Sequence, residues 1–86
     1  MYNMSYEKVA QDKTRVVIGV KQTLKAMKNG EVSEVFIADD ANQQLTQKVA
    51  SLAMELNIPC HHVGSKQKLG AACNIEVNAS SVAVKK

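Results

Sequence analysis

The stretch VVIGVKQTLKAMKNG, residues 16–30, decides the expected fold of this 86-residue chain. Its first three residues are β-branched and apolar, which is typical of a short buried strand. Gly19 ends that run, and apolar residues then recur at the spacing of a helix. They are Val20, Leu24 and Met27. Asn29-Gly30 supplies the left-handed residue that commonly ends a helix. The stretch therefore predicts a strand that passes directly into a helix.

The same passage repeats in the middle of the chain. Residues 35–38 form a second buried-strand candidate, and residues 39–42 carry carboxylates and an amide that can cap the next helix. An amphipathic stripe follows, and Asn57-Ile58-Pro59 ends it. The stripe consists of Leu45, Val49, Leu52, Ala53 and Leu56. We therefore expect a second strand and a second amphipathic helix.

The flanking segments complete the pattern. A short helix is expected after Ser5, because Tyr6, Val9 and Ala10 fall at helical spacing. Residues 60–63 are expected to form a strand, residues 66–72 a short helix and residues 82–84 a last strand. The order α-β-α-β-α-β-α-β favours an α/β fold, because right-handed crossovers lay each helix back on the sheet. The prediction is a three-layer α/β/α sandwich with a four-stranded mixed sheet.

Length and composition limit the classes of protein that fit. A chain this short has interior enough for one core, so residues 1–86 are expected to form a single domain. It has neither a secretory signal pattern nor an apolar run of the roughly 18 to 20 residues that a membrane span needs. Its two cysteines are too few for a disulfide framework. We expect a cytoplasmic protein, and a monomer because the core stripes use up the apolar residues.

The charge is distributed unevenly along the chain. The net charge is +3, and the three lysines between Gly19 and Gly30 have no acid among them. Five acidic residues face a single lysine between Glu31 and Glu55. The pattern predicts a basic side and an acidic side, and it is compatible with a polyanionic partner.

The predicted helix after Gly19 carries a basic face. At about 100° per residue, Lys21, Lys25 and Lys28 fall within an arc of roughly 60°. The helix start adds unpaired N–H groups and the positive end of the helix dipole, which favour an anion. Gln22 can both donate to and accept from a base edge. Phosphate binding is one interpretation, and a solvated helix face is the alternative. The absence of any acid from this face favours the first.

A second turn could contribute to the same surface. Residues 63–70 read Val-Gly-Ser-Lys-Gln-Lys-Leu-Gly, a strand end, a turn with Ser65 as helix cap, and two lysines. This turn and the Gly19 turn both follow strands. If those strands are parallel and neighbouring, both turns open on one edge and form one patch. An ordinary strand-to-helix loop is the alternative interpretation.

Catalytic and metal chemistry find no support in the sequence. His61 and His62 are adjacent in a predicted strand, so their side chains point to opposite faces and cannot ligate one ion. Ser65-x-x-Lys68 matches one element of a serine–lysine enzyme motif, but the accompanying motifs are absent. We expect no enzyme, no metal and no cofactor. Three aromatic residues leave few platforms for stacking bases, so an RNA reader of this composition should use shape and phosphates.

Five blocks of the chain, in order, resemble the L7Ae/L30e superfamily of ribosomal proteins, and more closely its small bacterial members. They are residues 19–25 with Asn29-Gly30, residues 35–40, Ile58-Pro59, residues 63–70 and Ile75-Glu76-Val77. The resemblance covers nearly the whole chain. It implies an α/β/α sandwich that binds kink-turns, which are sharply bent RNA helices with a bulge beside tandem sheared G·A pairs.

The resemblance also implies roles for individual residues. Lys21 and Gln22 would face the G·A edges, Lys25 would contact guanine or backbone, and Lys28 would hold phosphate. The turn that contains Val63, Gly64, Ser65 and Lys66 would pack on bulged nucleotides, and Asp40 would approach an extruded base. The archaeal pattern has Asn-Glu in place of Lys21-Gln22. An amide accepts a guanine edge less well than a carboxylate, so the implied kink-turn binding has a modified affinity.

Two hypotheses therefore stand side by side. The first is a non-enzymatic protein that binds structured RNA, ribosomal or regulatory. The second is a protein-interaction or ribosome-assembly subunit without specific kink-turn recognition. Salt separates the two, because neutralising several phosphates makes affinity fall steeply with ionic strength, whereas an ordinary protein interface responds weakly.

Overall fold

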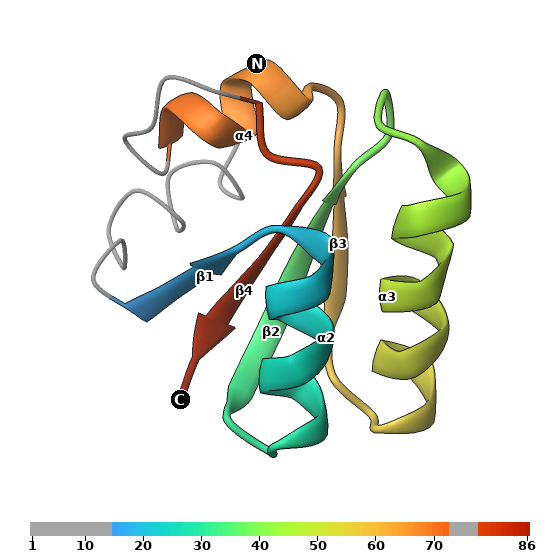
Figure 1. The fold of residues 1–86 in the computed structure, drawn as a ribbon, viewed down its shortest axis with the longest axis vertical. Coiled ribbons are helices and arrows are strands. Elements are labelled where there is room, and N and C mark those ends of the chain that lie inside the picture. Colours follow the sequence, from blue (N-terminus) through green and yellow to red (C-terminus); the bar gives the residue numbers. More distant parts are fainter. Residues whose placement is uncertain (1–14, 73–77) are drawn as a thin grey trace.

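A computed structural model describes residues 15–72 and 78–86 (Figure 1). Their elements are β1 (Val16–Ile18), α2 (Val20–Lys28), β2 (Val32–Ala38), α3 (Gln43–Glu55), β3 (Cys60–Val63), α4 (Lys66–Ala72) and β4 (Ser81–Lys85). From residue 16 onward, the element order is the one that the sequence predicts. The helix predicted after Ser5 and the block at residues 75–77 lie outside the described residues. No described helix is both long enough and apolar enough to cross a membrane.

The four strands form one mixed sheet in the order β1-β4-β2-β3. β4 is antiparallel to both of its neighbours, with Ala83 opposite Val17 on one side and Val35 on the other. β2 and β3 are parallel, with Phe36 opposite His61. β1, β2 and β3 therefore all run in the same direction. Their carboxyl ends share one edge of the sheet, here called the C-terminal edge.

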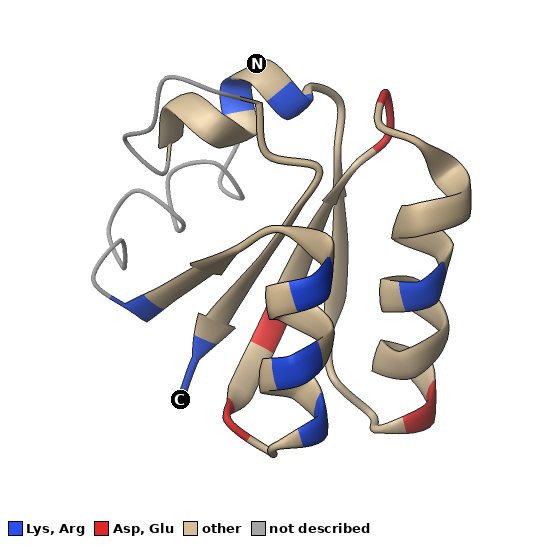
Figure 2. Ribbon diagram, in the orientation of Figure 1, with Lys and Arg blue, Asp and Glu red and all other residues tan. Residues whose placement is uncertain are grey.

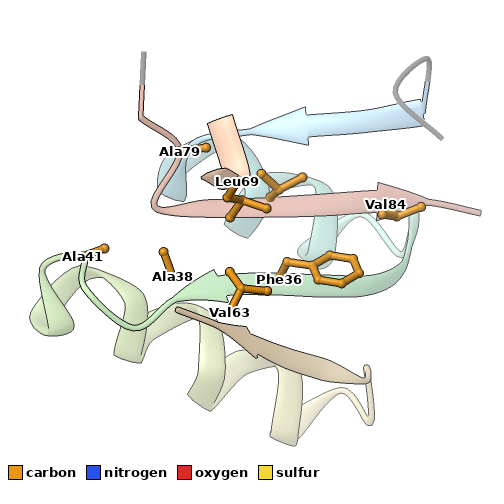
Figure 3. Packing of buried hydrophobic residues seen from close by; sticks show 8 residues of the cluster. Phe36, Ala38, Ala41, Val63, Leu69, Ala79 and Val84 are labelled. Atoms are coloured by element: carbon orange, nitrogen blue, oxygen red, sulfur yellow. The ribbon is translucent and has the colours of Figure 1, made fainter. Parts of the chain in front are cut away.

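Helices cover both faces of the sheet, as the three-layer prediction requires. α2 and α3 lie side by side on one face (Figure 1), over buried residues that include Val35, Ile37 and Ala83. α4 packs on the other face, where Leu69 joins Phe36, Val63 and Val84 (Figure 3). Adjacent strand residues alternate between the two clusters, so both faces of the sheet are apolar and buried. The four-stranded sheet, with β4 and β2 at its centre, is the middle layer.

The buried sides of the two long helices differ from the predicted stripes. In α2 the buried residues are Thr23, Ala26 and Met27, while Val20 and Leu24 are half-buried. In α3 the buried arc consists of Thr46, Val49 and Ala53, and the prediction that Leu45 and Leu56 belong to the core is wrong. Leu56 is the cap residue that follows the helix, and the buried arc of α3 is rotated away from Leu45 toward Thr46. Most of the side chains that the two helices bury are therefore small or β-branched, and Met27 is the large one.

Candidate nucleic-acid interface

Gly19 connects β1 to α2 in a conformation that glycine alone adopts readily. Its φ of 105° and ψ of 152° fall in a region that is essentially closed to side chains with a Cβ atom. Its N–H donates to the Ser81 carbonyl at 2.9 Å, and its own carbonyl accepts the first helical hydrogen bond, from Thr23 N–H, also at 2.9 Å. These bonds fix the start of α2 against β4. No side chain among the described residues caps this start, so its first N–H groups face outward.

The three lysines of α2 share its solvent face. Lys21, Lys25 and Lys28 are all exposed, and Figure 2 shows them in successive turns. At 100° per residue they lie roughly opposite the buried Thr23. No acidic residue stands in the first turn of the helix. At the helix start, Lys21 and the positive end of the helix dipole therefore both favour an approaching anion, while Lys25 and Lys28 lie in the last turn and extend the positive charge along the helix.

Gln22 lies over the bend that Gly19 makes. Its Oε1 is 2.6 Å from the point where a Cβ atom on Gly19 would stand. Gln22 itself is exposed. The absence of a side chain at Gly19 therefore leaves room for the carboxamide at the helix start, where it can donate to one group and accept from another.

The loop after β2 ties two elements of the C-terminal edge together. The Asp39 N–H donates to the Val63 carbonyl at 2.7 Å, and the Asp40 Oδ1 accepts from the Lys66 N–H at 2.8 Å. Asn42 caps α3, because its Oδ1 accepts from the Gln44 N–H at 2.9 Å. The carboxylate of Asp40 thus holds the start of α4, a structural contact that the sequence does not reveal.

The turn between β3 and α4 presents an open backbone. Val63 precedes the turn, and its side chain is buried in the core. Gly64 is exposed, and a Cβ atom placed on it would have no neighbour within 4 Å. Ser65 caps α4 as predicted, because its Oγ accepts from the Lys68 N–H at 3.1 Å. Lys66 is half-buried at the first position of the helix.

The two turns lie on the same edge because β1 and β3 run in the same direction, but the condition that these strands be neighbours is not met. β4 and β2 separate β1 from β3. At about 4.8 Å per strand spacing, this places the Gly19 and Gly64 turns roughly 14 Å apart. The segment before β4 bridges the gap. Ser81 accepts from Gly19, Ser80 accepts from the Ala38 N–H at 3.0 Å, and the Lys66 carbonyl accepts from the Ala79 N–H at 3.0 Å. The site is an extended edge, not a single cluster.

Residues 79–81 are the part of this edge that the sequence analysis missed. Their backbone groups join the starts of α2 and α4 to the end of β2. Small, mostly buried residues of this kind carry no charge or motif that would single them out. Only the strand order could have identified these residues, because their role depends on the position of β4 between β1 and β2.

Acidic groups interrupt the edge. Asp39 and Asp40 are exposed in the loop at the top of Figure 2, between the two basic helix starts along the sheet order. Asp39 pairs with His62, whose Nδ1 is 3.0 Å from the Asp39 Oδ1. The predicted separation into a basic side and an acidic side is therefore wrong at the C-terminal edge.

The two histidines point to opposite faces, as predicted. The His61 Nε2 is 2.9 Å from a Glu34 oxygen, and its ring stacks on Phe36 at 4.9 Å between centroids. His62 faces the α3 side with Asp39. Burial raises the pKa of the neighbouring Cys60 thiol, which keeps it protonated. Within the described residues, no three histidine, cysteine or acidic side chains come together as a metal site would require.

The fold and the edge together define a class: a small α/β/α sandwich with an open, basic helix start at the carboxyl ends of its strands. Comparison with known proteins gives the family. Residues 3–86 match the model of the Ribosomal protein L7Ae/L30e/S12e/Gadd45 family, and the chain belongs to that family.

Individual relatives and structures agree with this assignment. The chain is 49% identical to the RNA-binding protein YbxF of Geobacillus stearothermophilus, over 94% of this chain and 98% of the relative. It is 53% identical to an RNA-binding protein of Halalkalibacterium halodurans, over 96% and 100%. Its fold matches that of a Giardia lamblia 15.5 kD RNA binding protein with a TM-score of 0.88 at 23% identity, over 100% of this chain and 78% of the other.

Proposed function

We propose that this protein binds structured RNA at the C-terminal edge and recognises kink-turns there, without catalysing a reaction. The observation that carries the proposal is the start of α2. Lys21 and an open helix terminus lie next to Gly19, and the exposed Lys25 and Lys28 continue the basic face toward the far end of α2. Relatives that are 49% and 53% identical over nearly the whole chain are described as RNA-binding proteins, which supports RNA as the polyanion.

The kink-turn is the RNA shape that suits this arrangement. α2 offers phosphate-binding lysines along its length and one base-reading amide, Gln22, at a helix start that can enter a widened groove. The Gly64 turn stands roughly 14 Å away along the same edge, as three strand spacings require. A sharply bent RNA can bring the G·A pairs to Gln22 and Lys21 and the bulge to the Gly64 turn at once. A straight duplex would meet only one of the two.

In the proposed complex, different side chains of α2 supply affinity and discrimination. Phosphates contacted by Lys21, Lys25 and Lys28 supply affinity, and Gln22 supplies discrimination. Because Gln22 is an amide, its contact with a guanine edge lacks the charge of a carboxylate and is correspondingly weaker. The target is a ribosomal or regulatory RNA of the cytoplasm, bound by one copy of the protein.

A second candidate function rests on the exposed apolar residues near the C-terminal half of α3. Met54 is 81% exposed and Leu56 is 42% exposed, beside the opposite edge of the sheet. A protein partner could cover them. If this surface were the principal interface, affinity would depend on these residues and only weakly on salt.

The test is a titration of two RNAs. One contains a kink-turn, and the other replaces its tandem G·A pairs with Watson–Crick pairs. The proposal predicts much tighter binding of the kink-turn, with an affinity that falls steeply from 50 to 200 mM salt. Equal binding of both RNAs would mean that the site is a basic surface without kink-turn specificity. Binding of neither RNA would favour the protein-interaction function.

A further inference from the structure

A second group of basic residues lies at the end of the sheet opposite the C-terminal edge. Arg15 immediately precedes β1, Lys85 is the last residue of β4, and Lys86 follows it. All three side chains are exposed. Figure 2 shows basic positions at the start of β1 and at the end of β4, to the left of α2. This group, here called the Arg15 cluster, takes no part in the proposed contacts at Gly19 and Gly64.

The strand register brings Arg15 and Lys85 together. β1 and β4 are antiparallel, and Val16 is opposite Val84. One step further outward, Arg15 and Lys85 are therefore neighbours across the two strand ends. Neighbouring strands are about 5 Å apart, and like charges that face each other across strands repel. A bound anion would relieve this repulsion.

The negative charge near the cluster is small. The ion pairs that join described residues to one another both involve β3, at His61 and His62. Glu31 is the acidic residue beside the cluster, because its carbonyl accepts from the Lys86 N–H at 2.9 Å. Its exposed carboxylate forms no ion pair within the described part of the chain. One carboxylate beside three cations leaves a net positive surface.

The cluster continues the basic face of α2. Lys85 lies on the side of the sheet that α2 covers, because Ala83, two residues earlier, and Val32, its partner in β2, both belong to the core beneath that helix. α2 begins at the C-terminal edge and runs back along the sheet, so its last turn, with Lys25 and Lys28, approaches the cluster (Figure 1). Positive charge therefore extends along one face from one end of the sheet to the other.

The length of this face exceeds what the kink itself can cover. Four residues of extended chain separate Gly19 from Arg15, which corresponds to about 13 Å. The nine residues of α2 rise by about 14 Å over the same part of the sheet. A duplex carries phosphates along its whole length at intervals of a few ångströms. A stem that leaves the start of α2 along the helix therefore reaches the Arg15 cluster.

We propose that the Arg15 cluster binds the phosphate backbone of an RNA stem that flanks the kink-turn. The proposal rests on the proposed function, which places the kink-turn at the start of α2. Contacts of lysine and arginine with phosphates position a nucleic acid without reading its sequence. The cluster therefore adds affinity and aligns the stem with α2, while the choice of RNA stays with the kink-turn contacts.

The test compares kink-turn RNAs whose stems differ in length. In a short RNA both stems stop before the Arg15 cluster, and in two longer RNAs one stem or the other is extended by one helical turn. We expect one longer RNA to bind about fivefold more tightly in moderate salt, because two more phosphates form surface ion pairs. Its slope of log affinity against log salt should be steeper by about 2. Equal affinity for all three RNAs would overturn the proposal.

Substitutions decide whether the cluster is responsible for the gain. Arg15→Gln and Lys85→Gln should each lower the affinity for the longer RNA about two- to threefold and reduce its salt slope by about 1. The short RNA should be affected much less, because the removed charges lie beyond the screening length of about 8–10 Å from the kink. Equal losses for the short and the longer RNA would contradict a contact with the flanking stem.

Lys48→Gln is the matched control. It removes the same charge from an exposed position on α3, which lies on the other side of α2 from β1 in Figure 1. If Lys48→Gln also removes the gain from the longer stem, net charge and not the cluster is responsible. Melting in low salt provides a second readout. Arg15→Gln and Lys85→Gln should melt no lower than the unaltered protein, because each relieves a repulsion. A lower melting temperature would mean that the residue serves the fold.

The same titrations separate this proposal from the proposed function. The short kink-turn is also compared with its Watson–Crick version, which involves no stem long enough to reach Lys85. If the short kink-turn is preferred but a longer stem adds nothing, the Arg15 cluster is not an RNA contact and the proposed function stands. If the short kink-turn is not preferred, the proposed function fails whatever the longer stems do.

Discussion

The carboxylate of Asp40 accepts a hydrogen bond from the backbone N–H of Lys66, at 2.8 Å and across 26 residues of sequence. This contact joins the loop after β2 to the start of α4 and holds the Gly64 turn in place between them. Asp40 was predicted as an RNA-binding residue. Asp40 therefore has a structural role, and any contact that it makes with RNA must be compatible with its bond to Lys66.

Substitution of Asp40 separates these two roles. Asp40→Ala removes the acceptor and should lower the free energy of unfolding by about 1 kcal/mol, as the loss of a helix cap does. Asp40→Asn keeps an oxygen for Lys66 and should lower it by less. Urea unfolding measures both. If Asp40→Ala melts like the unaltered protein, the contact with Lys66 contributes nothing to stability.

The two glycines of the edge should respond differently to alanine. Gly19→Ala places a Cβ atom at φ 105°, so we expect a loss of about 1–3 kcal/mol in the free energy of unfolding. Gly64 has no positive φ and has open space around it, so Gly64→Ala should leave stability within about 0.5 kcal/mol. Gly64→Ala should nevertheless weaken RNA binding if RNA packs on this turn. Unchanged affinity would remove the turn from the interface.

The lysines of α2 should set the salt dependence of RNA binding. Each of Lys21→Ala, Lys25→Ala and Lys28→Ala should reduce the slope of log affinity against log salt by about 1 if the residue neutralises a phosphate. Lys48→Ala is the control, because Lys48 is an exposed lysine on a different helix, α3. A control variant that lowers the slope as much as the other three would mean that only net charge matters.

Thr23 offers a test of the packing beneath the site. Its Oγ1 is buried without a hydrogen-bond partner in the described structure. Thr23→Val replaces that hydroxyl with a methyl group of similar size. We expect a gain of about 1 kcal/mol, because an unsatisfied buried hydroxyl is removed. For a domain of this size, that gain raises the melting temperature by roughly 4–8 °C. A loss of stability would mean that the hydroxyl is bonded, for example to a buried water.

The sequence predicted the strand and helix order from residue 16 because its signals are local. Gly19, Asn29-Gly30 and Pro59 mark the ends of apolar runs whose strand or helix periodicity is clear. It misplaced Leu45 and missed Thr23 in the core, because the orientation of a helix depends on the neighbours against which it packs. The exposed lysines of α2 were predictable from spacing alone. The bridge through Ser80 and Ser81 was not, because it depends on the insertion of β4 between β1 and β2.

The most direct test of the central claim is a map of the protein amides that shift when kink-turn RNA is added. We expect the large NMR shifts along the C-terminal edge, at Gly19, Lys21, Gln22, Gly64 and Ser65. The amides near Met54 and Leu56, by the opposite edge of the sheet, should not move. Shifts concentrated around Met54 and Leu56 with none at Gly19 or Gln22 would contradict the claim that α2 begins the RNA interface.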